Sequence, residues 1–254
     1  MAVGTIIRRF ESLASTSDTA HDLLRDGAPH GTVVVAAEQT RGRGTKGRSW
    51  HSPRGLGLYA SFILRASAAQ DGPAPSFSLL PLAAGLAAAA AILDSAGVEV
   101  RLKWPNDLVH ERKKLGGILT EAVTRAGGAS DAIIGIGINV NQGEEDFPAE
   151  LRRAATSIRL VSGRPGDSGA LLSSLCRTLD CWYNSVIRGE RERIIRGYEE
   201  RMAFFAGGRV KAATARGEAA GVFRGLTPEG RLRLETAGGE ESLSFEEIRT
   251  LDWE

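Results

Sequence analysis

The chain has 254 residues, enough for one large domain or for a medium domain with a small companion. Apolar residues make up 42% and charged residues 25% of it, which excludes a disordered, collagen-like or coiled-coil chain. The formal net charge is +1, so no overall basic field draws the chain to nucleic acid or to a membrane surface.

Cysteine usage and apolar runs indicate where the protein works. Cys176 and Cys181 are too few for a disulfide scaffold or a thiolate metal site, and they are typical of a reducing compartment. They lie in a segment with helical periodicity, and we expect both to pack in the core. The longest apolar run, 79–93, is interrupted by Pro81 and is shorter than the roughly 20 residues of a membrane span. We also see no export signal, and therefore expect a cytoplasmic protein with no membrane partner.

The first part of the chain predicts short strands, two helices and a long loop. Runs of β-branched and other apolar residues predict strands at 5–7, 32–37 and 58–64. Ser15 is a candidate N-cap for a helix that ends near Arg25, and small residues predict a buried helix over 79–95. Residues 40–57 form a basic loop, and 66–75 a surface connection.

The second part begins with a clearly alternating segment. Residues 98–104 place Val98, Val100, Leu102 and Trp104 on one face, which predicts a half-buried strand that Pro105 ends. The following elements are a hairpin of 108–110 with 115–122, a strand over 131–141, helices over 169–206 with breaks near Gly189 and Gly197, and short strands after Gly208. The texture of the sequence changes at Gly207, so we expect a first domain of residues 1–206. Residues 207–254 are expected to form a small β-barrel.

The basic loop 42–49 carries the strongest local signal. Its glycines let backbone N–H groups converge on an anion, and Arg43, Lys46 and Arg48 add positive charge. It nearly matches a nucleotide-binding P-loop, but Arg48 replaces the lysine and the residues after Trp50 cannot start a helix. The loop therefore predicts an anion site of another kind. A flexible solvated loop and a nonspecific nucleic-acid patch remain the alternatives.

Two glycine-containing strands provide the second signal. In 133–139 the isoleucines share one face, and Gly135, Gly137 and Asn139 share the other, which leaves bare backbone where a flat ligand could lie. Close packing of a helix on these glycines is the alternative. Gly116 and Gly117 follow Lys114, which by itself reads as an exposed cation of a hairpin.

Together these segments supply cations, an acid and an amide at a strand end, and glycine-lined faces. That set suits a reaction that neutralises phosphate charge without a protein nucleophile. The four histidines are scattered without the spacing of metal ligands, and neither cysteine is placed as a nucleophile.

With these motifs in this order, the sequence resembles biotin protein ligases over residues 10–145. The matching segments are 15–17 (Ser-Thr-Ser), 38–40 (Glu-Gln-Thr), 42–53, 103–107 (Lys-Trp-Pro-Asn-Asp), 113–119 and 135–139 (Gly-Ile-Gly-Ile-Asn). The resemblance implies an α+β fold, in which a mixed sheet flanked by helices forms a biotin/lipoate ligase-like catalytic domain and a small SH3-like barrel follows it. It also implies an ATP-dependent reaction that forms biotinyl-5′-AMP and transfers biotin to a lysine of a biotin carboxyl carrier domain.

The resemblance further implies roles for individual residues. The catalytic residues would be Lys114, Arg43, Asp107 and Lys103. The biotin-binding residues would be Ser15, Thr16, Ser17, Gln39, Gly42, Arg43, Lys114 and Gly117. The nucleotide-binding residues would be Arg43, Gly44, Thr45, Arg48, Trp50, Asn106, Lys114 and Asn139. Mg²⁺ would be held by Asn106 and Asp107.

One residue departs from the family pattern, since Thr45 stands where the loop commonly has a second arginine. Fourteen residues precede Ser15, too few for the winged helix-turn-helix of repressor members, so we expect a short form that does not bind DNA. The expected partners are biotin, ATP and the carrier domain, and the resemblance leaves a homodimer open.

Three rival functions differ from this one. A lipoate ligase or octanoyltransferase resembles biotin ligases in fold, but the transferase needs a cysteine nucleophile and the expected triple-glycine signature of lipoate ligases is missing. A nucleic-acid-binding module would use the arginine loop and the terminal strands, but the near-neutral net charge of the chain argues against this function. A biotin-binding sensor would lack the reaction with ATP.

Overall fold

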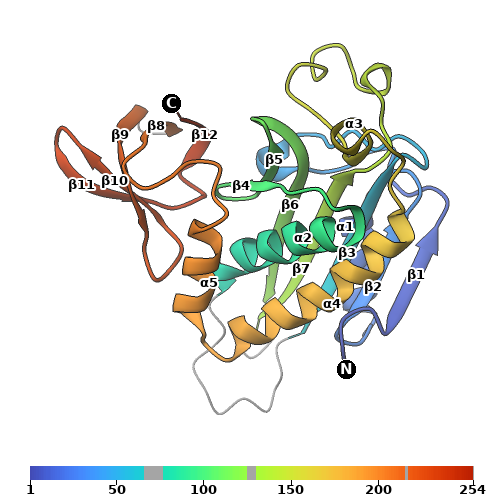
Figure 1. Cartoon of the computed structure of the whole chain (residues 1–254). Coiled ribbons are helices and arrows are strands. Elements are labelled where there is room, and N and C mark those ends of the chain that lie inside the picture. Colours follow the sequence, from blue (N-terminus) through green and yellow to red (C-terminus); the bar gives the residue numbers. More distant parts are fainter. Residues whose placement is uncertain (66–76, 125–129, 215–216, 254) are drawn as a thin grey trace.

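The chain folds around a seven-stranded sheet, and a second sheet of five strands lies beside it at the C-terminal end (Figure 1). The computed structural model describes residues 1–65, 77–124, 130–214 and 217–253. The surface connection expected over 66–75 lies outside these residues. No helix among the described residues is long and apolar enough to cross a membrane.

The large sheet is mixed. Its strands are β1 (Ile6–Phe10), β2 (Thr32–Ala36), β3 (Gly57–Leu64), β4 (Arg101–Lys103), β5 (Asp107–His110), β6 (Lys113–Thr124) and β7 (Ser130–Asn139). They are ordered β1-β2-β3-β7-β6-β5-β4. Among the described pairs, β1 and β2 run parallel and the others antiparallel, which confirms the predicted mixed sheet.

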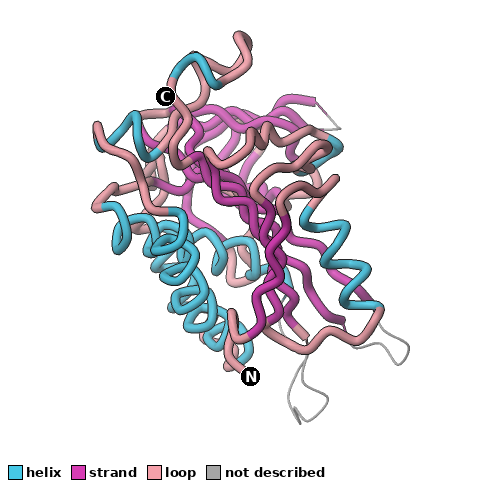
Figure 2. Tube along the Cα trace, turned by 90° about the vertical axis from the view of Figure 1, so that its right-hand side faces the viewer, coloured by secondary structure: helices cyan, strands magenta, loops and turns pink. Residues whose placement is uncertain are grey.

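Alternation along the strands gives this sheet two different faces. Ile134, Ile136 and Ile138 pack into the main core with α2 (Leu80–Ala96) and α4 (Ser168–Ile187). Ile133, one position out of phase, packs on the opposite face with Ala20 of α1 (Thr16–Arg25). Figure 2 shows the sheet with helices on both sides. The predicted inward face of β7 is confirmed, and its glycine face turns toward α1.

The helices begin and end at residues whose chemistry favours those positions. The Ser15 side chain accepts the backbone N–H of Asp18, so Ser15 is the N-cap that the sequence predicts. Helix α2 ends at Gly97, which has φ of 68°, a left-handed conformation that glycine adopts without steric cost. Two shorter helices, α3 (Ile158–Ser162) and α5 (Arg191–Glu199), complete the described α-helices.

Several expectations about these elements are corrected. Of the strand predicted over 98–104, only three residues form β4. This strand is short because its partner β5 ends at His110, whose ring already contacts the Glu99 carbonyl. Val98 and Val100 are nevertheless buried, as the alternation predicts. The helical stretch breaks at Gly189, whereas Gly197 lies inside α5, where a Cβ would stand 3.3 Å from the Trp182 ring.

Other differences concern residues that no pattern marked. Helix α3 was not expected, and residues 200–206 are not helical. Cys176 is buried as expected, but Cys181 is exposed. Five positions along an α-helix turn a side chain to a different face, so one residue of the pair points away from the core.

The C-terminal strands form an antiparallel sheet. They are β8 (Arg209–Thr214), β9 (Gly217–Leu226), β10 (Leu232–Thr236), β11 (Gly239–Leu243) and β12 (Ile248–Trp253). Their order is β11-β10-β9-β8-β12, and no pairing of the edge strands β11 and β12 closes the expected barrel within the described residues. The buried Trp104 indole donates to the Gly230 carbonyl at 3.0 Å and joins this sheet to the main domain. We propose that the domain boundary lies between residues 206 and 207.

Candidate active site

A cavity of about 290 Å³ lies where α1, the basic loop, the ends of β6 and β7, and β12 meet. It brings together most of the residues that the sequence singles out. Those that line it are Thr16, Ser17, Gln39, Arg43, Gly44, Thr45, Arg48, Trp50, Lys103, Asn106, Asp107, Lys114 and Gly117. Segments from distant parts of the chain therefore form one site.

The other three predicted residues stand behind this lining. Ser15 is buried as the N-cap of α1. Gly42 lies so close to the Trp50 carbonyl that a Cβ would approach its oxygen to 2.5 Å. Asn139 is buried and donates to the Thr156 carbonyl at 2.9 Å. We infer that these residues support the walls of the cavity.

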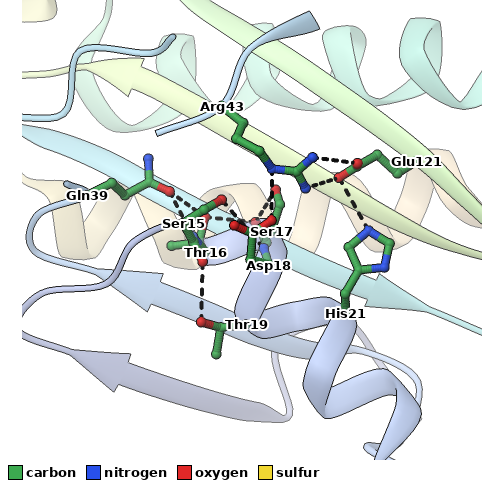
Figure 3. Close-up of polar contacts among 10 residues, drawn as sticks. Ser15, Thr16, Ser17, Asp18, Thr19, His21, Gln39, Arg43 and Glu121 are labelled. Atoms are coloured by element: carbon green, nitrogen blue, oxygen red, sulfur yellow. Dashed lines mark hydrogen bonds and ion pairs between the residues drawn. The ribbon is translucent and has the colours of Figure 1, made fainter. Parts of the chain in front are cut away.

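A chain of hydroxyl groups and one amide forms the polar end of the cavity (Figure 3). Gln39 Oε1 accepts the Thr16 backbone N–H at 2.8 Å and the Thr16 hydroxyl at 3.0 Å. The buried Ser61 hydroxyl contacts Thr16 Oγ1 at 2.8 Å and Ser17 Oγ at 3.1 Å. Each group can donate or accept, so this end can pair the edge of a ligand that carries both N–H and C=O groups.

The floor of the cavity is made of glycine backbone, and the Trp50 indole covers it. A Cβ at Gly137 would stand 2.5 Å from Trp50 Nε1, and a Cβ at Gly117 would stand 3.2 Å from Trp50 Cζ3. In this structure the Trp50 side chain is the flat group that lies over this strand. The indole N–H is buried without a hydrogen-bond partner in the described part of the chain.

Two lysines and two carboxylates form the charged end. Lys114 Nζ lies 2.6 Å from Asp107 Oδ1 and 5.3 Å from the centre of the Trp50 ring, so Lys114 is not the free hairpin cation of the alternative reading. Lys103 Nζ lies 3.9 Å from Asp252 Oδ1 and 5.0 Å from the centre of the Trp253 ring. Burial lowers the pKa of Lys103, while Asp107 and Asp252 oppose that shift. This end of the cavity can therefore neutralise an anionic ligand.

The hairpin of β5 and β6 places Asp107 and Lys114 side by side. Glu111 and Arg112 occupy its turn with φ of 46° and 68°, and the register shifts between Leu108 and Val109. Asp107 pairs with Gly117, which has no side chain to separate the carboxylate from the lysine. The charged pair is thus fixed by the local backbone.

The basic loop reaches the C-terminal domain. Arg48 donates to the Arg249 carbonyl at 2.6 Å, and Asn106 Nδ2 donates to the Ile118 carbonyl at 3.0 Å and lies 3.5 Å from Thr45 Oγ1. Strand β12 lines the cavity from Ile248 to Asp252, together with Phe245. Sequence reasoning missed this contribution, because no motif marks the segment.

Arg43 lines the cavity and is also paired with two carboxylates. Its guanidinium makes a bidentate ion pair with Glu121 at 2.8 and 2.9 Å, and its Nε lies 2.9 Å from Asp18 Oδ1 (Figure 3). Neither carboxylate was predicted. Strand alternation offered a signal, because Gly117, Leu119 and Glu121 share one face of β6.

Comparisons with known proteins identify relatives of this chain. Residues 9–139 match the biotin/lipoate A/B protein ligase family, and residues 206–249 match the biotin protein ligase C-terminal domain. The chain is 37% identical to the bifunctional ligase/repressor BirA of Bacillus spizizenii over 93% of this chain and 71% of that protein. It is 30% identical to the biotin–[acetyl-CoA-carboxylase] ligase of Mycobacterium tuberculosis over 94% of this chain and 87% of that one.

A solved structure has the same fold. The biotin protein ligase of Aquifex aeolicus, in complex with biotin and ATP, superposes with a TM-score of 0.82 at 28% identity and covers 98% of this chain and 100% of that chain. The matches span both domains, including the C-terminal sheet for which the sequence offered no motif. The chain therefore belongs to the biotin protein ligase family.

Proposed function

We propose that the protein is an ATP-dependent biotin ligase, which activates biotin as biotinyl-5′-AMP and transfers it to a specific lysine of a biotin carboxyl carrier domain. The observation that carries this proposal is the cavity itself. Its polar end suits the ureido ring of biotin, and Lys114 stands at its charged end beside Asp107. The relative from Aquifex aeolicus, solved with biotin and ATP, supports the choice of substrates.

In the first step, a carboxylate oxygen of biotin attacks the α-phosphorus of ATP, and the bond from that phosphorus to the bridging oxygen of pyrophosphate breaks. Two anions have to approach each other, so a cation between them stabilises both the encounter and the transition state. We assign that role to Lys114, with Lys103 as the second cation. Asp107 holds Lys114 in place until the substrates bind.

In the second step, the amine of the carrier lysine attacks the acyl carbon, the bond from that carbon to the AMP oxygen breaks, and an amide forms. A lysine amine has an ordinary pKa of about 10.4, so it is mostly protonated at neutral pH and must lose a proton. Asp107 lines the cavity beside Lys114, and we assign it the role of accepting this proton once Lys114 has turned to the adenylate.

The nucleotide would bring Mg²⁺ with it. Asn106 and Asp107 offer one amide oxygen and one carboxylate, which fits a magnesium ion whose remaining ligands are phosphate oxygens and water. Bound there, the ion would supply positive charge to the phosphates. Among the described residues, no group of three or more His, Cys, Asp or Glu side chains could hold a metal independently of the nucleotide.

The carrier domain of a biotin-dependent carboxylase is the partner that this reaction requires, and we propose the cytoplasm as its site. The absence of DNA binding and the option of a homodimer stay predictions, which a binding assay at varied salt and a measurement of molecular mass would test.

Biotin-dependent exchange of labelled pyrophosphate into ATP tests the proposal. We expect exchange that requires biotin and that lipoate does not support. A protein that binds biotin without catalysing exchange would be a sensor, and exchange driven by lipoate would make the chain a lipoate ligase. Either result would replace the proposed function.

A further inference from the structure

Glu121 and Asp18, the two carboxylates that pair with Arg43, have no role in the proposed reaction. We propose that Glu121 and Asp18 are positioning residues, which hold the loop 42–50 over the cavity through Arg43 and thereby slow the escape of the acyl-adenylate. This inference rests on the proposed function for its second half, the retention of the intermediate. The first half concerns the ligand-free protein.

Arg43, Glu121 and Asp18 form a set of ion pairs that we call the clamp. Glu121 Oε1 and Oε2 each accept one terminal nitrogen of Arg43, at 2.9 and 2.8 Å, and Asp18 takes Nε from the side of α1 at 2.9 Å. Three of the five guanidinium N–H groups are thus engaged. A bidentate pair of this kind adds both energy and directional specificity. His21 Nε2 lies 3.5 Å from Glu121 Oε2.

The loop transmits this anchoring to the cavity because its own backbone is cross-linked. The Gly44 N–H donates to the Arg48 carbonyl at 2.7 Å, and the Trp50 N–H donates to the Gly42 carbonyl at 2.8 Å. Arg43 and Ser49 form an isolated antiparallel bridge between these two bonds. Fixing Arg43 therefore fixes Trp50, whose indole covers the glycine floor.

The two carboxylates lie on different elements, so the clamp connects the loop to both α1 and β6. Asp18 is in the first turn of α1, beside Thr16 and Ser17, and Glu121 is on β6, four residues after Gly117. Side-chain exposures of 24% for Glu121 and 37% for Arg43 leave the pair partly shielded from water. Arg43 thus ties the loop to both walls of the cavity.

Limited trypsin digestion of the ligand-free protein tests the first half. Glu121→Gln removes the bidentate pair without changing any cleavage site, and we expect cleavage after Lys46 and Arg48 to become about three- to tenfold faster. Glu11→Gln is the matched control, because it removes a carboxylate 3.0 Å from Arg54, another arginine of the same segment, which does not line the cavity. Its cleavage after Lys46 and Arg48 should stay at the parental rate.

A double variant tests whether Glu121 acts through Arg43. In an Arg43→Gln background, Glu121→Gln should add nothing to the cleavage rate. If Glu121→Gln does not fold, Asp18→Asn removes the Nε contact and should accelerate cleavage in the same direction. Equal cleavage of the parent and whichever carboxylate variant folds, or a full effect of Glu121→Gln without Arg43, would overturn the clamp.

Release of biotinyl-adenylate tests the second half. We expect Glu121→Gln to release the intermediate about three- to tenfold faster and to raise KM for biotin more than it lowers kcat of pyrophosphate exchange. Unchanged release together with a loosened loop would overturn the retention role. If the parent shows no exchange at all, the proposed function fails, while the digestion experiment still decides the clamp.

Discussion

Gly137→Ala tests the contact between the glycine floor and Trp50. The new Cβ would stand 2.5 Å from Trp50 Nε1 and 2.6 Å from Cε2, whereas ordinary contacts begin at 3.4 Å. The indole must therefore shift by about 1 Å, and overpacking of this kind costs roughly 1–3 kcal/mol. Because the loop carries Trp50 over the reacting groups, we expect biotin-dependent pyrophosphate exchange to fall by about 100-fold.

The assay compares four proteins in a cycle. Trp50→Ala removes the obstacle, so adding Gly137→Ala to that background should change the exchange rate less than about twofold. Gly238→Ala is the control, since its Cβ would meet nothing closer than Thr236 Oγ1 at 3.7 Å. If Gly137→Ala keeps the parental exchange rate, or lowers it equally with and without Trp50, the contact with the indole is not the cause of the loss.

Three further predictions concern charge and thiols. Lys114→Met and Lys114→Ala should each lower pyrophosphate exchange by about 100- to 1000-fold, because either change leaves the two substrate anions unscreened. Near-parental exchange would contradict the role of Lys114 as the cation between them. Thr45→Arg should reduce biotinylation of bystander lysines by restoring a cation that retains the adenylate, and equal leakage would reject this idea. Burial raises the pKa of Cys176 to about 11, so a maleimide at pH 7 should label the exposed Cys181 alone, which mass spectrometry of peptides would show. The labelled protein should keep its pyrophosphate exchange, and a loss of this activity would point to a cysteine mechanism.

The main sheet could be predicted because its signals are local. Alternation identifies the faces of β7, and Ser15 identifies the start of α1 through a hydrogen bond within one turn. The length of β4 could not be predicted, because it depends on where β5 ends. The helix break predicted at Gly197 is wrong, because this glycine lies within α5 and makes room for the Trp182 ring.

The motif residues converge on one cavity, but their contacts could not be read from the sequence. Glu121 and Asp18 are ordinary charged residues until the fold brings them to Arg43. Strand β12 likewise enters the site through docking of the C-terminal sheet, which Trp104 stabilises by bonding Gly230, 126 positions away. Contacts across such separations depend on tertiary packing, which no local pattern records.

The C-terminal sheet shows the same limit in another way. Turn residues such as Gly230 and Gly239, both with positive φ, mark its hairpins in the sequence. Whether the strands close on themselves depends on twist and on the pairing of edge strands, which turn residues do not determine. The described pairings leave β11 and β12 at opposite edges.

A crystal structure with a non-hydrolysable analogue of biotinyl-adenylate would show directly whether Lys114 bridges the acyl group and the phosphate. We predict that Lys114 Nζ leaves Asp107 and lies about 3 Å from the oxygens that join the acyl group to the phosphate, with the ureido ring between Ser17 and Gln39. An analogue bound with Lys114 still paired to Asp107 and remote from the acyl phosphate would contradict it.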